Sequence, residues 1–127
     1  YIQEVDGARD LACRGAGTIA ISKHLCGNAV DQVFHLCARS GEWPAAFAMS
    51  SCCHHKLQYG DYVNRPFLAA LGIRDHATLM AVARKAGWQA SENPPWQQLI
   101  GAAVEALFDL GRVLWLRERG YAAFSVS

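Results

Sequence analysis

Two short segments of the chain are rich in side chains that can do chemistry, Lys23-His24-Leu25-Cys26-Gly27 and Cys52-Cys53-His54-His55. The second segment places four potential metal ligands in a row, whereas tetrahedral zinc sites use spaced pairs that let the chain turn around the ion. Contiguity therefore argues against zinc, and we assign no metal ligand. Two other interpretations stay open: a zinc-binding module built from Cys26, Cys52, Cys53 and the histidines, and buried thiols that pack as small hydrophobes.

Lys23 and Cys26 are the most informative residues of the first segment. Lys23 follows a short apolar run, so its ammonium group must face solvent, a carboxylate or a ligand. Cys26 precedes a predicted helix start, where the helix dipole favours a thiolate, and His24 is nearby in sequence. Nucleophilic catalysis and a purely structural thiol both fit this pattern. Asp31 falls in the first turn of that helix, where the dipole alone favours a carboxylate.

The elements around these segments predict a βαβ unit. Residues 18–22 form an apolar run with β-branched side chains, residues 28–39 carry apolar side chains at helical spacing before Gly41, and residues 45–49 form a second short apolar run. A βαβ unit has two parallel strands whose carboxyl ends lie on one edge of the sheet. Open α/β sheets bind ligands beyond that edge. The two segments are therefore expected to form one site.

The remainder of the chain predicts helices and one more strand. Residues 62–71 and 75–85 are expected to be short helices, and a long amphipathic helix follows the linker 91–95 and ends before Gly120. Asn93 is the expected cap of the long helix, and residues 121–126 are expected to form a closing strand. The arginines of the long helix are expected to form a solvated face, with a tRNA-contacting patch as the alternative; they are Arg112, Arg117 and Arg119.

Composition indicates a single globular domain. The chain has 127 residues, of which 52% are hydrophobic, and its 12 basic and 11 acidic side chains nearly cancel, so no global field draws it to phosphate or to a membrane surface. Charged or polar residues interrupt every apolar stretch, and the N-terminus lacks a signal pattern. Five cysteines, an odd number, favour a reducing compartment. We expect an intracellular protein, in cytoplasm or nucleus, and the start at Tyr1 without Met indicates a fragment.

The segment Lys23–Asp31, followed by Cys52-Cys53-His54-His55 and then by Tyr62-Val63-Asn64, resembles the tRNA methyltransferases that modify the ribose 2′-hydroxyl of nucleotide 4 in the acceptor stem. In that family the segments read KHLCGxATD and CCHHRC, with a YV pair downstream. The similarity continues through Leu71-Gly72, Trp88, Asp109-x-Gly111-Arg112, Leu116 and Gly120. This sequence departs from the family pattern in having Val30 for Thr, Lys56-Leu57 for Arg-Cys and Tyr59 for Trp.

The resemblance implies an α/β fold: residues 1–127 would be the C-terminal part of a Rossmann-like class I methyltransferase sheet with its flanking helices. It also implies S-adenosylmethionine as cofactor and tRNA as partner, with no membrane or obligate protein partner. The family's glycine-rich cofactor loop and its zinc-binding segments lie upstream of the matching region. The residues implied for catalysis are Lys23, His24, His54 and His55. Those implied for cofactor binding are Asp6, Lys23, Cys26 and Cys52.

The reaction predicted from this resemblance is methyl transfer to a ribose 2′-oxygen. A histidine titrates near neutrality and suits the general base, which makes His54 or His55 the candidate, whereas Lys23 suits stabilisation of the developing oxyanion or a neighbouring phosphate. Adjacent histidines cannot be ranked from sequence. The alternatives are a methyltransferase that acts on a base or a protein, and the zinc-binding module without enzymatic activity.

Because the cofactor loop is not in this stretch, we expect residues 1–127 alone to be inactive and to bind S-adenosylmethionine weakly or not at all. Isothermal titration calorimetry of the isolated chain with the cofactor measures this directly. A micromolar dissociation constant would contradict the expectation.

Overall fold

The computed structural model describes residues 17–125. It begins with the predicted βαβ unit: strand β1 (Ile19–Cys26), helix α1 (Ala29–Ser40) and strand β2 (Ala46–Cys52). The strands are parallel and pair from Ile19 with Ala46 to Cys26 with Cys52. The Asp6 assignment lies outside the described residues. Two parallel strands do not distinguish a Rossmann-like methyltransferase sheet from other α/β sheets, so that class stays a prediction.

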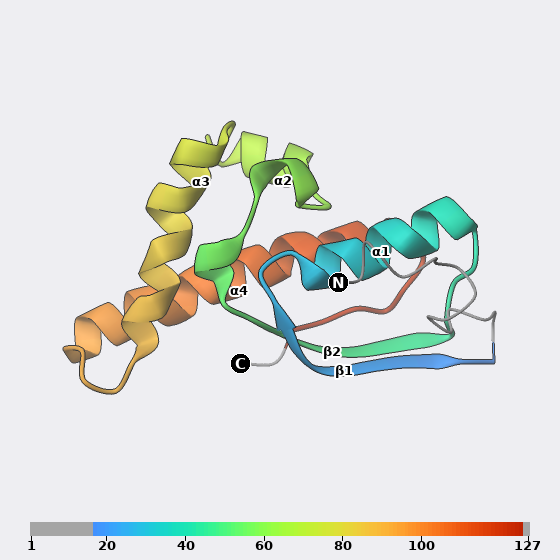
Figure 1. Cartoon of the computed structure of the whole chain (residues 1–127), viewed down its shortest axis with the longest axis horizontal. Coiled ribbons are helices and arrows are strands. Elements are labelled where there is room, and N and C mark those ends of the chain that lie inside the picture. The colour runs from blue at the N-terminus through green and yellow to red at the C-terminus, as the bar shows by residue number, and fades with distance from the viewer. Residues whose placement is uncertain (1–16, 126–127) are drawn as a thin grey trace.

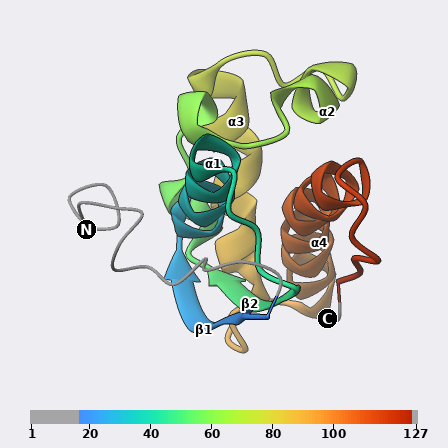
Figure 2. The same ribbon diagram turned by 90° about the vertical axis from the view of Figure 1, so that its right-hand side faces the viewer.

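Helices α1 and α4 (Pro95–Arg117) both lie on one side of the strand pair, which is seen in two views (Figures 1 and 2). On the other side, Ile19 and Ile21 expose 62% and 77% of their surface. Helix α1 ends where predicted, because Gly41 adopts the left-handed conformation at φ 71° and its N–H caps the Cys37 carbonyl. The sheet therefore has one covered and one open face in the described part of the chain.

After β2 the chain passes through two short 3₁₀ turns, η2 (His54–Lys56) and η3 (Tyr59–Asp61), to the short helices. The helix expected over 62–71 is shorter, α2 (Arg65–Ala70), because the Asn64 side chain accepts the Phe67 N–H and so fixes the start. The helix expected over 75–85 is α3 (His76–Ala83), capped by Asp75 and continued by the 3₁₀ segment η4 (Arg84–Gln89).

Two predictions about the C-terminal part are wrong. Asn93 does not cap α4, since the cap position is Pro94 and the Asn93 side-chain amide donates instead to the Trp88 carbonyl. Residues 121–125 form no strand: the Ala123 N–H turns back to the Tyr121 carbonyl, and the Ala123 carbonyl accepts from Arg117. The N–H and carbonyl groups of Ala123 therefore form local hydrogen bonds and do not pair with a neighbouring strand.

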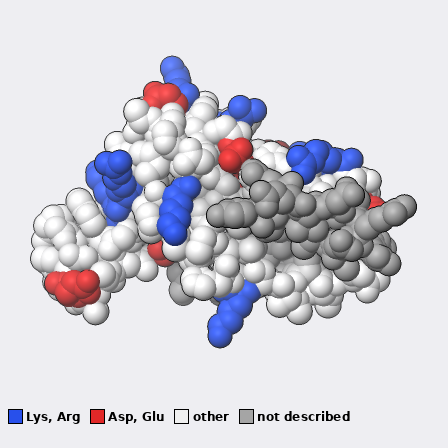
Figure 3. Space-filling model, in the orientation of Figure 1, with Lys and Arg blue, Asp and Glu red and all other residues white. Residues whose placement is uncertain are grey.

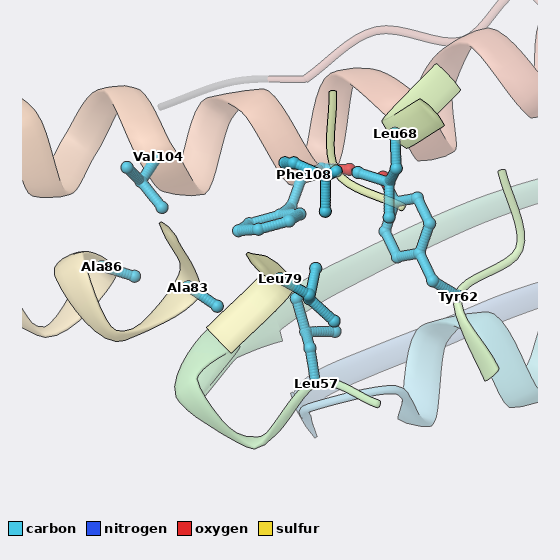
Figure 4. Close-up of a cluster of buried hydrophobic side chains, with 9 residues drawn as sticks. Leu57, Tyr62, Leu68, Leu79, Ala83, Ala86, Val104 and Phe108 are labelled. Carbon is cyan, nitrogen blue, oxygen red and sulfur yellow. The ribbon is translucent and has the colours of Figure 1, made fainter. Parts of the chain in front are cut away.

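The core consists of two main clusters that α4 joins. Near its middle, α4 contributes Val104 and Phe108 to a cluster under α2 and α3 (Figure 4). Further along, Trp115 and Leu116 pack on the α1 side of the strands, where Trp115 stacks on Phe34 with ring centroids 5.6 Å apart. The other buried members of the first cluster are Leu57, Tyr62, Leu68, Ile73, Leu79, Ala83 and Ala86. None of the helices in the described part of the chain is long and apolar enough to cross a bilayer.

Gly111 permits the closest approach between α4 and the segment before α2. A Cβ added at Gly111 would overlap the Tyr62 hydroxyl and come within 2.7 Å of Phe67 Cδ1, whereas one added at Gly87 would meet nothing within 4 Å. We expect Gly111→Ala to lower the free energy of unfolding by about 2–3 kcal/mol because of overpacking. Urea denaturation measures this. Gly87→Ala is the matched control and should change stability by no more than about 1 kcal/mol; equal stabilities of the two variants would contradict the close approach.

Candidate functional site

The two segments singled out from the sequence meet at the carboxyl edge of the strand pair, as predicted. Cys26 and Cys52 are in-register partners at the ends of β1 and β2. The Gly27 N–H then donates to the Cys52 carbonyl at 2.9 Å, which continues the contact into the following turn. Gly27 has φ +57°, and a Cβ there would lie 3.1 Å from the Lys56 carbonyl oxygen. Only glycine fits this turn without strain.

An irregularity in strand pairing decides which way the first segment faces. Ser22 pairs with Met49, but Leu25 pairs with Ser51, so the register shifts between them. Up to this point the odd-numbered residues of β1 are the exposed ones; after it His24 and Cys26 are exposed and Leu25 is half-buried. A bulge that changes which residues face outward accounts for this pattern. Lys23, His24 and Cys26 are consequently all exposed at the edge.

His24, Cys26 and Cys52 form a compact group in which the potential ligand atoms all lie within 4.8 Å of one another. The sulfur atoms of Cys26 and Cys52 are 3.1 Å apart, within hydrogen-bond distance, and form no disulfide. A hydrogen bond from Cys52 lowers the pKa of Cys26, and Cys53 and Lys56 lower it further. Desolvation, followed by the same hydrogen bond, raises the pKa of Cys52 to about 12. The pair can therefore hold one thiolate stabilised by its neighbouring thiol.

The adjacent histidines face different environments. Cys53 adopts a left-handed conformation at φ 52°, the one positive φ among the non-glycine residues described, and the chain then enters η2. His54 is 2% exposed and stacks on Phe108, whereas His55 is exposed. The structure thus separates two residues that the sequence could not rank.

The imidazole of His54 lies between two carboxylates of α4. Its Nδ1 is 3.5 Å from Glu105 and its Nε2 is 3.7 Å from Asp109, and neither nitrogen has a hydrogen-bond partner. Asp109 also accepts from the Ser51 hydroxyl at 2.9 Å and from Arg112 at 3.0 Å. Burial acts to raise the pKa of Asp109, but His54, Arg112 and Ser51 together hold it below the usual value.

Asp31 and Arg112 form a buried ion pair beneath the edge. The Arg112 Nη2 atom donates to Asp31 at 2.7 Å and to the Gly27 carbonyl at 3.1 Å. Asp31 further accepts from the Val63 N–H at 3.0 Å. The expectation that Arg112 lies on a solvated face is wrong, since Arg112 is 3% exposed and Asp31 is fully buried. Asp31 thus has a specific cation partner beyond the helix dipole.

Sequence reasoning missed the polar stripe of α4. Glu105, Asp109 and Arg112 recur at spacings of four and three, the spacing of one helix face, and this signal was available in the sequence. Together with Ser51 they line part of a cavity of about 600 Å³ between β2 and α4. The other two arginines do not join them: Arg117 donates to the Ala123 carbonyl, and Arg119 lies 3.4 Å over the Trp115 ring.

The described residues form an α/β unit with a polar cluster at the carboxyl edge of two parallel strands, and open α/β sheets commonly bind ligands at that edge. Residues 4–95 match the family model described as methyltransferase TRM13, and this chain belongs to that family. No solved structure matches the chain at a significant level.

The chain is also similar to several curated proteins. A glutathione S-transferase C-terminal domain-containing protein is 31% identical over 117 residues in both Bos taurus and Homo sapiens, which covers 89% of this chain and 18% of theirs. The tRNA:m(4)X modification enzyme TRM13 of Saccharomyces cerevisiae is 38% identical over 75 residues, covering 49% of this chain and 16% of the enzyme. The TRM13 enzyme of Eremothecium gossypii is 29% identical over 140 residues, which covers 89% of this chain and 31% of the enzyme. The chain therefore spans less than a third of the length of each of these relatives.

Removing Arg112 should leave the Asp31 carboxylate buried without a cation. We expect Arg112→Ala to lower the free energy of unfolding by about 3–5 kcal/mol, measured by urea denaturation. Arg74→Ala, at an exposed arginine between α2 and α3, is the control and should change it by less than about 0.5 kcal/mol.

A double-mutant cycle with Asp31→Asn tests the origin of that loss. The two substitutions should be non-additive by about 1–3 kcal/mol, because each removes the partner of the other. Additive effects would show that Arg112 acts through packing and not through the ion pair.

Proposed function

We propose that this chain provides the acceptor edge of an S-adenosylmethionine-dependent methyltransferase that modifies a ribose 2′-hydroxyl of tRNA. The observation that carries the proposal is the meeting of the two segments at one carboxyl edge, in a chain of which residues 4–95 match a methyltransferase family. The curated fungal relatives are described as tRNA:m(4)X modification enzymes, which supports tRNA as the substrate. A Rossmann-like sheet with S-adenosylmethionine beyond its carboxyl edge is part of the same proposal.

The described residues suit the acceptor side of this reaction. S-adenosylmethionine supplies a methyl group bound to a sulfonium sulfur. The ribose 2′-oxygen must lose its proton as it attacks that carbon, so a base and a cation near the oxygen accelerate the step. Lys23 is an exposed cation at the edge, and its ammonium suits the oxyanion or an adjacent phosphate.

Exposure favours His55 over His54 as the general base. His55 is exposed directly after the end of β2, whereas His54 is enclosed by Phe108 and two carboxylates. In the proposal His55 accepts the ribose proton, and His54 is a positioning residue that fixes the turn against α4. His24 is exposed beside Lys23 and can contact the substrate. The adenine contact of Asp6 and the cofactor contacts of Lys23, Cys26 and Cys52 belong to the same proposal.

Binding of tRNA would depend on local contacts. On the face seen in Figure 3, the Lys and Arg side chains of the described residues stand apart from one another and form no continuous basic patch. The net charge of +1 adds no long-range attraction. Individual cations close to the edge, such as Lys23 and Lys56, are therefore the candidates for phosphate contacts.

The test is methylation of unmodified tRNA by the protein expressed at the full length that its gene encodes. We expect Lys23→Ala to lower kcat by about 100-fold or more without changing the melting temperature, because it removes a transition-state cation. Lys85→Ala, at an exposed lysine in η4, is the matched control and should leave the rate unchanged. A wild-type rate from folded Lys23→Ala would remove this residue from the mechanism.

The histidines and the product are checked in the same assay. His55→Ala should lower the rate without changing the melting temperature, whereas His54→Ala should mainly lower the melting temperature. Resistance of the product to alkaline cleavage next to the modified nucleotide identifies a 2′-O-methyl group. A methylated but cleavable tRNA would indicate a base as acceptor, and labelled protein would indicate a protein substrate.

A further inference from the structure

We propose that His24, Cys26 and Cys52 form a binding site for a soft divalent cation of the zinc type. Their ligand atoms lie within 4.8 Å of one another, and all three side chains are exposed or half-exposed at the sheet edge. Two thiols and an imidazole are the donors that Zn²⁺ prefers. This inference does not depend on the proposed methyl transfer.

The backbone brings these three donors together without help from flexible loops. Alternate residues of a strand face the same side, so His24 and Cys26 share the exposed side once the bulge has changed the phase of β1. Cys52 is the direct partner of Cys26 on the neighbouring strand. The ligand set is therefore a pair at i and i+2 on one strand and a single residue on the next, a different set from the contiguous row at 52–55.

The distance between the sulfur atoms also fits a shared ion. At 3.1 Å they are too far apart for a disulfide. In a tetrahedral site with Zn–S bonds of about 2.3 Å they would lie roughly 3.8 Å apart, which a small side-chain rotation provides.

Cys53 is not one of the ligands in this proposal. Its sulfur lies outside the group of mutually close donor atoms, although it influences the pKa of Cys26. With three protein ligands, the fourth position of a tetrahedral ion is left for water or another small ligand, as in zinc sites that remain open. Because both strands contribute ligands, the ion would connect the ends of β1 and β2.

Titration of the 127-residue chain with Co²⁺ in the presence of a non-thiol reductant tests the proposal. We expect one ion per chain, a sulfur-to-cobalt charge-transfer band, the strong visible bands of tetrahedral cobalt, and displacement by Zn²⁺. Cys26→Ser and Cys52→Ser should each weaken binding by about 100-fold or more, and His24→Ala by at least about 10-fold.

Half-exposed Cys53, which follows Cys52 in the chain, and His76, an exposed histidine at the start of α3, provide matched controls. Cys53→Ser and His76→Ala should bind cobalt as the unmodified chain does. In a measurement that needs no variant, Zn²⁺ should protect Cys26 and Cys52, but not Cys53, from alkylation in the unmodified chain. The proposal is overturned by the absence of a charge-transfer band, by its persistence in Cys26→Ser and Cys52→Ser, by its loss in Cys53→Ser, or by unprotected alkylation of Cys26 and Cys52.

Discussion

The ion pair between Asp31 and Arg112 holds together parts of the chain that are far apart in sequence. Asp31 lies in the first turn of α1 and Arg112 near the end of α4, and the pair also binds the Gly27 carbonyl and the Val63 N–H. A buried pair adds little net stability compared with well-packed apolar side chains, because desolvation of both charges opposes their attraction. Its directional hydrogen bonds, however, determine how α4 is rotated and positioned against the turn after β1. We therefore explain its presence by specificity more than by stability.

That rotation of α4 serves both the core and the edge of the sheet. With Arg112 fixed on Asp31, Phe108 packs among the buried side chains of α2 and α3, and Tyr62 donates its hydroxyl proton to the Phe108 carbonyl at 2.6 Å. The same rotation turns Glu105 and Asp109 toward His54. One helix thus fills the core and supplies the carboxylates below the ends of the strands.

The sequence predicted the positions of the elements better than the partners of their polar residues. The runs at 18–22 and 45–49 predicted parallel strands whose carboxyl ends share an edge. The helix predicted over 28–39 lies between them, and two strands joined by a crossover helix are usually parallel. The prediction of a strand at residues 121–126 was wrong. Its apolar pattern suits a strand, but its backbone groups form hydrogen bonds with one another and with Arg117. The prediction that Arg112 lies on a solvated face was wrong, because its burial depends on Asp31, a partner 81 residues away in the sequence. Pairing of Cys26 with Cys52 depends on the register and the bulge, which residue patterns do not encode.

The conformation of Cys53 explains how one edge has two chemically different sides. A left-handed backbone at a residue other than glycine costs about 1–2 kcal/mol and persists where its surroundings enforce it. Here the reversal directs His54 to the carboxylates of α4 while Cys52 remains beside Cys26 on the strand pair. Without the reversal, the chain would continue β2 as an extended strand, and consecutive side chains would alternate between the two faces. The strain at Cys53 therefore separates the buried imidazole of His54 from the exposed or half-exposed thiols, lysine and histidines at the edge of the sheet.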